Sequence, residues 1–438
     1  MEWYLIISLF LGSLIILIFT GLPVSFSFFL VSCTTMFLLF GEAGIRQLIL
    51  GMQNQLNNFT FTAIPFFVLM GEIFFHSGII TKSMDAVSKL VRNLPGRLCS
   101  VTLITGAIFA ALTGSGIANI AMFGSLMLPE MRKRGYDTGL TATSIMASGT
   151  LAIIIPPSTL LLILAGISGI SAANLLLGAI VPGLIMAALF LGYIIVRCII
   201  NPDLAPQSQD DAEVVGIPFS ERIKEFCLHV VPLMIIILVI ILTIFTGFGT
   251  TTEAAAAGAF AAYILTFFYR KFSFDLLKKT LIGSIRSSVM LLFIIAASVG
   301  YSQVLSLTGA SRSMVMAVTS IIGSEIALLI IMILITFFVG TFMNESSTMM
   351  VTLPLFMPII REFGINDVWF GVLMMVTIMV GQFSPPVGMG CFAMKGVSPP
   401  DVTLGTIFKA AVPIILVITL VIALLLLFPA LATTIPGV

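Results

Sequence analysis

Long apolar segments separated by short polar ones run through most of this 438-residue chain. Segments of about 18 or more apolar residues are long enough to cross the hydrocarbon core of a bilayer, where a backbone must form helices to satisfy its polar groups. Segments that approach or exceed this length predict ten crossings in an all-α polytopic membrane protein. They cover residues 3–20, 22–40, 62–76, 139–167, 175–198, 228–246, 253–269, 287–307, 370–394 and 404–428.

Two further apolar segments, 98–131 and 326–360, are interrupted near their centres by small or polar residues. Each is too long for a single helix across about 30 Å of hydrocarbon. We therefore expect two re-entrant helical hairpins, each of which enters and leaves the membrane on the same side.

The composition agrees with this class and excludes others. Apolar residues make up 59% of the chain and charged residues 9%, against about 25% charged residues in soluble domains. The net charge of +1 leaves no basic surface for nucleic acid. Five scattered cysteines and two distant histidines predict neither a disulfide framework nor a transition-metal site.

The chain divides into two related halves around one polar stretch. Residues 201–227 are expected to form a cytoplasmic linker between a first repeat, 1–200, and a second, 228–438. A shift of 229 positions brings several residues of the first half onto the same residue type in the second. The coincident pairs are Gly71 with Gly300, Pro129 with Pro358, Arg132 with Arg361, Gly135 with Gly364, and Pro156-Pro157 with Pro385-Pro386.

The distribution of basic residues sets the expected topology, because cytoplasmic loops are rich in Lys and Arg. With both termini outside and two hairpins, every Lys and Arg except Arg46, Arg312 and Arg361 falls on the cytoplasmic side. Five crossings per half invert the second half relative to the first. Inverted-topology repeats are typical of secondary transporters.

Two charged segments, Ile79–Asn93 and Phe274–Arg286, carry their charges at helical spacing. This spacing predicts amphipathic helices that lie along the membrane interface. Ordinary solvated loops are the alternative.

The breaks in the apolar segments are the candidate site, because unwound backbone at membrane depth is tolerated only inside protein or beside a cavity. The first hairpin turns at Thr113-Gly114-Ser115-Gly116, with Asn119 one helical turn later, and the second turns over residues 340–348. Hydroxyl and carbonyl oxygens suit a small alkali cation, and the helix after each tip offers N-terminal amides to an anion. Polar contacts between helices are the alternative reading.

Each half supplies a second break about 41 residues after the tip, at Pro156-Pro157 and at Pro385-Pro386. Consecutive prolines open a helix because they remove amide donors. We expect each tip to face one broken helix, so that two cation sites flank one substrate cavity. The predicted cavity residues are Thr113, Ser115, Pro156, Pro157, Ser158, Asn344, Glu345, Ser346, Pro385 and Pro386.

Three carboxylates, Glu72, Glu253 and Glu345, lie in or beside the spans, where charge is expensive unless it is paired or functional. Glu345 is a candidate for cavity polarity or for a cation partner. Glu253 is expected to cap the helix that it begins. Glu72 and His76 are spaced for a contact on one helix face, which is structural or, alternatively, relays protons. No arginine lies at either tip or break.

The motifs resemble those of one transporter family. They are Gly21–Val24, Ile64–Glu72, Thr113–Asn119, Pro129 with Arg132–Arg134, Ile155–Ser158, Phe248–Ala254 and Ser384–Gly388. Together, in this order, they are similar to the large membrane subunit, of DctM or SiaM type, of tripartite ATP-independent periplasmic (TRAP) transporters. The similarity covers nearly the whole chain.

This resemblance implies a sodium-coupled importer of small organic acids in the bacterial inner membrane, with both termini periplasmic and an elevator motion. It also implies two partners, a small four-span membrane subunit (Q type) and a periplasmic substrate-binding protein (P type). Na⁺ is the implied coupling ion and no organic cofactor is expected. The matching sodium ligands are Gly114, Ser115, Asn119 and Ser158 for one site, and Thr341, Asn344, Gly381 and Ser384 for the other.

Other functions remain as alternatives to this importer. A stand-alone sodium–dicarboxylate symporter would need no binding protein. An intramembrane enzyme would need a nucleophile beside a base, which the pair of His76 and Glu72 is not expected to have. A channel would need a repeated pore lining. The substrate stays open among dicarboxylates, sialic acid and sulfonates.

Overall fold

The computed structural model describes residues 3–91, 94–206, 218–321 and 323–437, and within these ranges it is helical without strands. The helices are numbered in their order along the chain. They are α1 (Trp3–Phe19), α2 (Val24–Leu56), η1 (Phe59–Thr62), α3 (Ala63–Ser77), α4 (Ile79–Leu90), α5 (Arg97–Thr113), α6 (Gly116–Lys133), α7 (Thr138–Ile154), α8 (Thr159–Ser168), α9 (Ala172–Gly178), α10 (Ile180–Ile200), η2 (Pro202–Leu204), α12 (Phe219–His229), α13 (Val231–Phe245), α14 (Thr251–Phe268), α15 (Phe274–Leu307), α16 (Ala310–Ile321), α17 (Glu325–Gly340), α18 (Glu345–Glu362), α19 (Asp367–Phe383), α20 (Met389–Val397), α21 (Leu404–Leu427) and α22 (Ala430–Thr433).

Every predicted crossing coincides with a helix or a helix pair. By length and apolar composition, six helical segments of the described chain could span a membrane, or eight if two bent pairs each count as one span. The bent pairs are α7 with α8, at 42°, and α12 with α13, at 46°. The molecule is therefore a polytopic, membrane-embedded helical protein, while the count of ten crossings stays a prediction.

Two long helices differ from the sequence prediction. α15 runs for 34 residues without interruption, so Phe274–Arg286 is the first part of that helix and not a separate interfacial one. Helix α2 continues to Leu56 and is interrupted by non-helical backbone at Gly41. The sequence reading missed this continuation because residues 42–56 mix polar and apolar positions.

The other predicted amphipathic segment is a helix over Ile79–Leu90, with Ile79, Ile80 and Val87 buried and Lys82 exposed. Asn93 lies outside the described residues. The predicted linker is partly helical: α12 begins at Phe219, and η2 covers Pro202–Leu204. Residues 207–217 of the linker also lie outside the described part of the chain.

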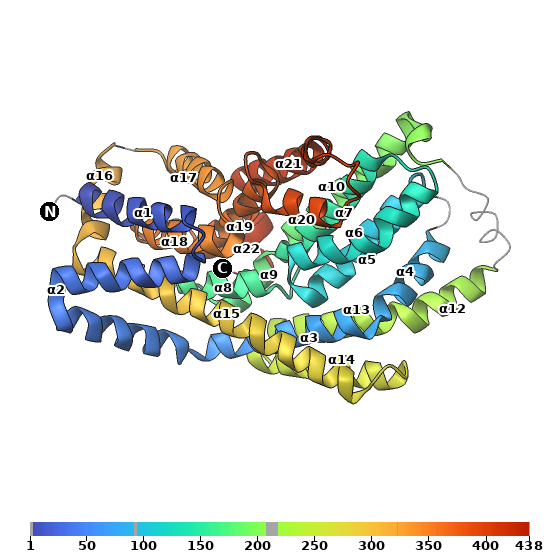
Figure 1. Cartoon of the computed structure of the whole chain (residues 1–438), viewed down its shortest axis with the longest axis horizontal. Coiled ribbons are helices and arrows are strands. Elements are labelled where there is room, and N and C mark those ends of the chain that lie inside the picture. The colour runs from blue at the N-terminus through green and yellow to red at the C-terminus, as the bar shows by residue number, and fades with distance from the viewer. Residues whose placement is uncertain (1–2, 92–93, 207–217, 322, 438) are drawn as a thin grey trace.

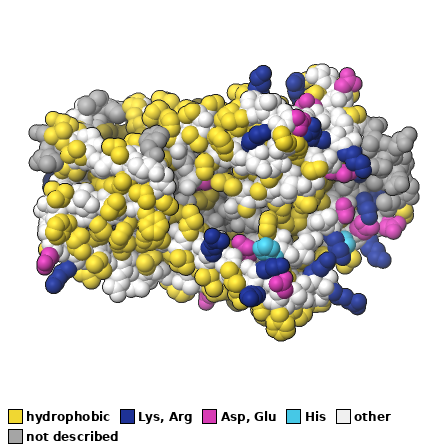
Figure 2. Space-filling view, in the orientation of Figure 1, with side chains coloured by type: hydrophobic (Ala, Val, Ile, Leu, Met, Phe, Trp, Pro, Cys, Tyr) yellow, Lys and Arg dark blue, Asp and Glu magenta, His cyan; other side chains and the backbone are white. Residues whose placement is uncertain are grey.

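The helices form two neighbouring groups (Figure 1). Helices α2, α3, α13, α14 and α15 lie along one long side, where α15 packs on α2 and α3, and α14 packs on α3. The hairpin helices and the broken helices form the other group, in which α7 packs on α5 and α6, and α19 on α17 and α21. Charged side chains gather at one end of the visible face, while hydrophobic side chains cover much of the rest (Figure 2).

The two predicted hairpins are each a helix, a short turn and a second helix. The two ends of the first hairpin lie together, since the Leu98 amide is 3.5 Å from the Tyr136 hydroxyl. Equivalent helices have equal lengths: α6 and α18 have 18 residues each, and α7 and α19 have 17 each. This correspondence supports the duplication that the 229-residue shift predicts.

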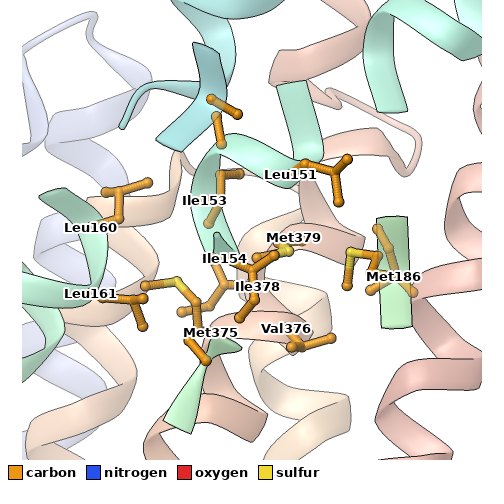
Figure 3. Packing of buried hydrophobic residues seen from close by; sticks show 14 of the residues in the cluster. Leu151, Ile153, Ile154, Leu160, Leu161, Met186, Met375, Val376, Ile378 and Met379 are labelled. Carbon is orange, nitrogen blue, oxygen red and sulfur yellow. The ribbon is translucent and has the colours of Figure 1, made fainter. Parts of the chain in front are cut away.

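The core between the two broken helices is apolar and tightly packed. Ile154 of α7 lies beside Ile378 and Met379 of α19, and Leu151 of α7 and Met186 of α10 belong to the same cluster (Figure 3). All five side chains are buried. Apolar burial of this kind, worth about 25 cal/mol per Å², holds the two broken helices together.

Candidate functional site

The first hairpin tip is built by one glycine and one cap. Gly114 ends α5 in the left-handed conformation, at φ +61°, which glycine adopts without steric cost. Ser115 then caps α6, because its hydroxyl accepts a hydrogen bond from the Ala118 amide at 3.4 Å. The sequence Gly-Ser therefore reverses the chain and leaves the N-terminus of α6 at the turn.

This tip meets the broken helix of its own half. The Thr159 hydroxyl, at the start of α8, donates to the Gly114 carbonyl at 3.0 Å. Ser158, the residue before it, caps α8 by accepting from the Leu161 amide at 3.4 Å, and its hydroxyl donates to the Ile153 carbonyl at 2.7 Å. The predicted pairing of the first tip with the Pro156-Pro157 break is confirmed as a contact.

Asn119 anchors the helix after the tip. Its amide nitrogen donates to the Ser148 carbonyl of α7 at 2.9 Å and to the Gly106 carbonyl of α5 at 3.3 Å. Its side-chain oxygen is buried and has no hydrogen-bond partner among the described residues. A buried oxygen without a donor is a candidate ligand for a cation or a water molecule.

The second tip is built differently. Asn344 caps α18 by accepting from the Ser347 amide at 2.9 Å. The Thr341 and Ser384 hydroxyls donate to carbonyls of their own helices, Phe338 at 2.7 Å and Val380 at 2.8 Å. Gly340 packs directly on Gly381 of α19, where a Cβ would lie 2.5 Å from the Gly340 carbonyl carbon.

A cavity of about 560 Å³ connects the two tips. The first tip contributes residues Thr113–Ala118, the second contributes Glu345 and Ser346, and α8 contributes Thr159 and Leu160. Helices α3 and α15, from the other group of helices, close the opposite wall. The expectation that both tips reach one chamber is therefore confirmed in geometry.

Only four of the ten predicted cavity residues line this chamber: Thr113, Ser115, Glu345 and Ser346. Pro156 and Pro157 instead line a small apolar cavity with residues of α9, α10 and α13. The prediction was wrong for both prolines, because the break packs against α9, α10 and α13 and not against the chamber. Ser158, Asn344, Pro385 and Pro386 also lie outside the chamber; Ser158 is buried in its cap, and Pro385 and Pro386 are exposed.

Helices α3 and α15 add cavity residues that the sequence reading did not assign. Glu72 and His76 form a pair, with Nε2 and Oε2 3.2 Å apart, and both line the chamber. Their spacing and the charge in an apolar helix were the available signals. Ser287, Met290 and Leu291 of α15 also line it, but nothing in their sequence pattern marks them.

The third intramembrane carboxylate has the structural role that its position predicts. The Glu253 carboxylate accepts from the Thr250 amide at 2.7 Å, and the Thr250 hydroxyl caps the Glu253 amide at 3.2 Å. This reciprocal capping box stabilises the start of α14. Glu253 is not among the residues that line the chamber.

The chamber offers hydroxyls, carbonyls and two helix N-termini, which are ligands for alkali cations and small anions. Among the described residues, no group of three or more His, Cys, Asp or Glu side chains could hold a metal ion together.

Comparison with known proteins identifies the family of this site. Residues 11–431 match the family model described as tripartite ATP-independent periplasmic transporter, DctM component. The chain is 31% identical to the protein YgiK of Salmonella typhimurium, over 99% of this chain and 97% of that protein. It is 29% identical to the C4-dicarboxylate TRAP transporter large permease protein DctM of Pseudomonas aeruginosa, over 91% of each chain.

A more distant relative is named for a different substrate. The sialic acid TRAP transporter large permease protein SiaM of Vibrio cholerae is 25% identical over 96% of each chain. Among solved structures, the YdaH transporter of Alcanivorax borkumensis matches with a TM-score of 0.65 at 14% identity, over 90% of each chain. At this level of identity, the similarity shows a shared fold alone.

Proposed function

Because this chain belongs to the DctM component family of tripartite ATP-independent periplasmic transporters, we propose that it is a sodium-coupled importer of a small organic acid anion. It is a transporter permease and not an enzyme, as its curated relatives are. Large permeases of this family work with a small membrane subunit and a periplasmic binding protein. We propose that this chain does the same in the bacterial inner membrane, with both termini periplasmic.

The single observation that carries this proposal is the chamber between the two hairpin tips. Its volume of about 560 Å³ suits a small organic acid. Each tip ends in a capped helix N-terminus, at Gly116 and at Glu345, and these amides favour a carboxylate or sulfonate group. The names of two relatives, for C4-dicarboxylate and sialic acid, support an organic acid.

Sodium coupling is supported by the oxygen atoms around the tips. The proposed first site comprises Gly114, Ser115, Asn119 and Ser158, and the unpaired Asn119 oxygen is available there. The proposed second site comprises Thr341, Asn344, Gly381 and Ser384, where Gly340 and Gly381 bring two backbones together. A hydroxyl that donates its proton to a carbonyl still has lone pairs for a cation.

We propose that the two repeats are inverted and that the hairpin group moves as an elevator against the group of α2, α3, α13, α14 and α15. The chamber lies between these two groups of helices, which supports a substrate carried at a moving interface. The two groups approach closely near the tip, where a Cβ at Gly71 of α3 would lie 2.9 Å from the Cα atom of Thr113. The gathering of charge at one end of the molecule supports the proposed orientation.

Uptake into proteoliposomes tests the proposal. The chain is reconstituted with its small subunit, and uptake of organic acids is measured with an inward sodium gradient and the binding protein. Uptake that needs both is the expected result. Uptake without sodium would contradict coupling, and equal uptake of free substrate without the binding protein would identify a stand-alone symporter.

Two variants connect this transport to the site. Ser115→Leu and Asn344→Leu should each abolish uptake and leave membrane insertion intact, because each places a bulky apolar group in a tip. Normal uptake by both variants would remove the tips from the site.

A further inference from the structure

The turn between α14 and α15 contains an arginine in an unusual backbone conformation. Arg270 has a φ of +53° and is the one residue other than glycine with a positive φ in the part of the chain that the structure describes. A residue with a Cβ rarely adopts this left-handed conformation, because the Cβ approaches the following carbonyl oxygen. Glycine is the usual residue at such a position after a helix. Backbone strain of this kind is typical of positions where the side chain has a function.

Backbone hydrogen bonds hold this turn in one shape. The Thr266 carbonyl accepts from the Lys271 amide at 2.8 Å and from the Phe272 amide at 3.2 Å. The Phe267 carbonyl accepts from the Arg270 amide at 2.9 Å. The Phe267 and Phe272 rings stack with their centroids 4.0 Å apart. The two basic side chains, Arg270 and Lys271, are therefore exposed side by side in sequence on a well-ordered turn.

The helices on both sides expose apolar side chains as far as the turn itself. On α14, Phe260, Ile264 and Phe268 recur at helical spacing, and all three are exposed, Phe268 by 80%. On α15, Phe274 is 84% exposed, and Ile282 further along the helix is also exposed. Exposed apolar faces on membrane-embedded helices contact lipid tails, and aromatic residues gather where the tails meet the headgroups. The turn therefore lies at headgroup level.

Three basic side chains at this level lack an anionic partner within the protein. Arg270, Lys271 and Lys278 are exposed, and none forms an ion pair with a residue that the structure describes. The nearest carboxylate in sequence, Asp275, pairs with Lys279 at 2.7 Å. Clusters of Lys and Arg beside a membrane span attract anionic headgroups. The charge of the turn is thus complementary to an anionic membrane surface.

We propose that the α14–α15 turn is a binding surface for anionic phospholipid. Arg270 and Lys271 bind the headgroup phosphate, and Phe268 and Phe274 insert among the acyl chains. A guanidinium suits this role because it can donate two parallel hydrogen bonds to a phosphate. Phosphatidylcholine carries the same phosphate, but its quaternary ammonium group is repelled by the basic side chains.

This surface belongs to the group of α2, α3, α13, α14 and α15, and it lies apart from the chamber, to which α15 contributes from Ser287 onward. Bound lipid therefore anchors this group of helices in the bilayer. The proposal needs only that the chain is embedded in a membrane, so it stands or falls separately from the proposed transport function.

Lipid titration tests the proposal. The full chain is purified with its small subunit in detergent, and thermal stabilisation is measured as phosphatidylglycerol or phosphatidylcholine with the same acyl chains is added. We expect an apparent affinity at least about tenfold higher for phosphatidylglycerol. Arg270→Gln and Lys271→Gln should each lower this ratio about fivefold, which is the contribution of one basic residue near an anionic surface.

Three further variants separate the turn from other causes. Arg312→Gln removes an exposed arginine from the helix α16, with the same change in charge, and should keep the ratio. Arg270→Gly removes the charge and relieves the backbone, so it should lower the ratio without lowering thermal stability in detergent alone. Phe268→Ala should weaken the binding of both lipids equally, because it removes apolar contact and no charge.

The opposite results overturn the proposal. Equal affinity of the wild type for the two lipids would refute it, and so would a ratio that survives both Arg270→Gln and Lys271→Gln. An equal loss in Arg312→Gln would show that net charge, and not the turn, attracts the lipid. Stabilisation by soluble glycerol phosphate as strong as that by phosphatidylglycerol would show a site for soluble anions in place of a lipid surface.

Discussion

The two hairpin tips occupy equivalent positions in the two halves and both pack backbone against backbone on their broken helices, while the first tip adds a side-chain hydrogen bond. The first tip is joined by the Thr159 hydroxyl, which donates to the Gly114 carbonyl at 3.0 Å, and by the packing of Gly116 on Gly149 of α7, where a Cβ at Gly116 would lie 2.8 Å from the Gly149 carbonyl oxygen. The second tip is joined by backbone packing, Gly340 on Gly381, with no space for a Cβ at Gly381. The hydrogen bond can be removed by a substitution that keeps the packing, whereas a backbone contact cannot.

Because of this difference, the two proposed cation sites can bind cations with unequal affinity. A single hydroxyl–carbonyl hydrogen bond contributes about 1 kcal/mol and can break and reform as a ligand enters. A close contact between two backbones resists separation because a tightly packed interior does not deform gradually. We therefore expect the hydrogen bond at the first tip to respond to ligands more readily than the backbone contact at either tip.

The largest expected effect comes from Gly381→Ala. The new methyl group would lie 2.5–2.7 Å from three backbone atoms of Gly340, and backbone cannot move aside as a side-chain end can. Overpacking of this kind costs about 1–3 kcal/mol, so the thermal midpoint and sodium-driven uptake should both fall. Gly396→Ala is the matched control, since nothing lies within 4 Å of its Cβ. Equal behaviour of the two variants would show that the backbone contact is unimportant.

At the first tip, Gly114→Ala should have the next largest effect. Alanine at φ +61° costs about 1 kcal/mol, and its Cβ would lie 3.1 Å from the Thr159 amide nitrogen. Gly309→Ala has a positive φ of +70° in open space. Thermal unfolding should register backbone strain in both variants, and uptake should fall only in Gly114→Ala. Loss of uptake in both would mean that strain, and not the site, is responsible.

Thr159→Val removes the hydroxyl and keeps the shape of the side chain. Stability should fall by about 1 kcal/mol, and Thr159→Ser, which keeps the donor, should recover most of it. Chemical denaturation of the three proteins provides the comparison. A valine variant as stable as the wild type would show that this hydrogen bond does not hold the first tip.

The smallest expected effect comes from loss of the ion pair of Arg132, one of the two arginines at the ends of the hairpins. Arg132 pairs with Asp401, at 2.6 Å, while Arg361 donates to the Ser168 carbonyl at 2.9 Å and to Asp367 at 3.1 Å. The hydrogen bond from Arg132 lowers the pKa of the Asp401 carboxyl. The stabilisation from this lowered pKa is complete above the unfolded-state pKa of Asp401 and is lost as the pH falls through the folded-state value.

Acidification should therefore lower the thermal midpoint of the wild type slightly more than that of Asp401→Asn, below about pH 4. The effect is small because the pair is at the surface. Identical pH profiles for the two proteins would contradict it.

Much of the helix pattern could be predicted from the chain. Apolar length located the helices, the interruptions at Gly114 and near Asn344 located the tips, and Pro156-Pro157 located a break that the structure bends by 42°. The prediction of Phe274–Arg286 as a separate helix was wrong, because charge spacing does not tell where a helix continues into an apolar segment. The Glu253 cap was correct because its signal is local in sequence.

The cavity could be predicted only in part. Thr113, Ser115, Glu345 and Ser346 were identified from tip chemistry alone. The direction in which Pro156 and Pro157 face depends on α9, α10 and α13, which no local pattern relates to the break. Ser287 joins the chamber through the packing of α15 on α3, a contact between residues more than 200 positions apart.

The central claim is that both tips bind sodium around one chamber, and direct sodium binding tests it. Binding of ²²Na⁺ to the purified chain is measured by equilibrium dialysis for the wild type, Asn119→Ala and Thr341→Ala, with Thr319→Ala, on exposed α16, as control. The account predicts saturable binding in the wild type and the control, and loss of part of the bound sodium in each site variant. Unchanged stoichiometry and affinity in both site variants would contradict it.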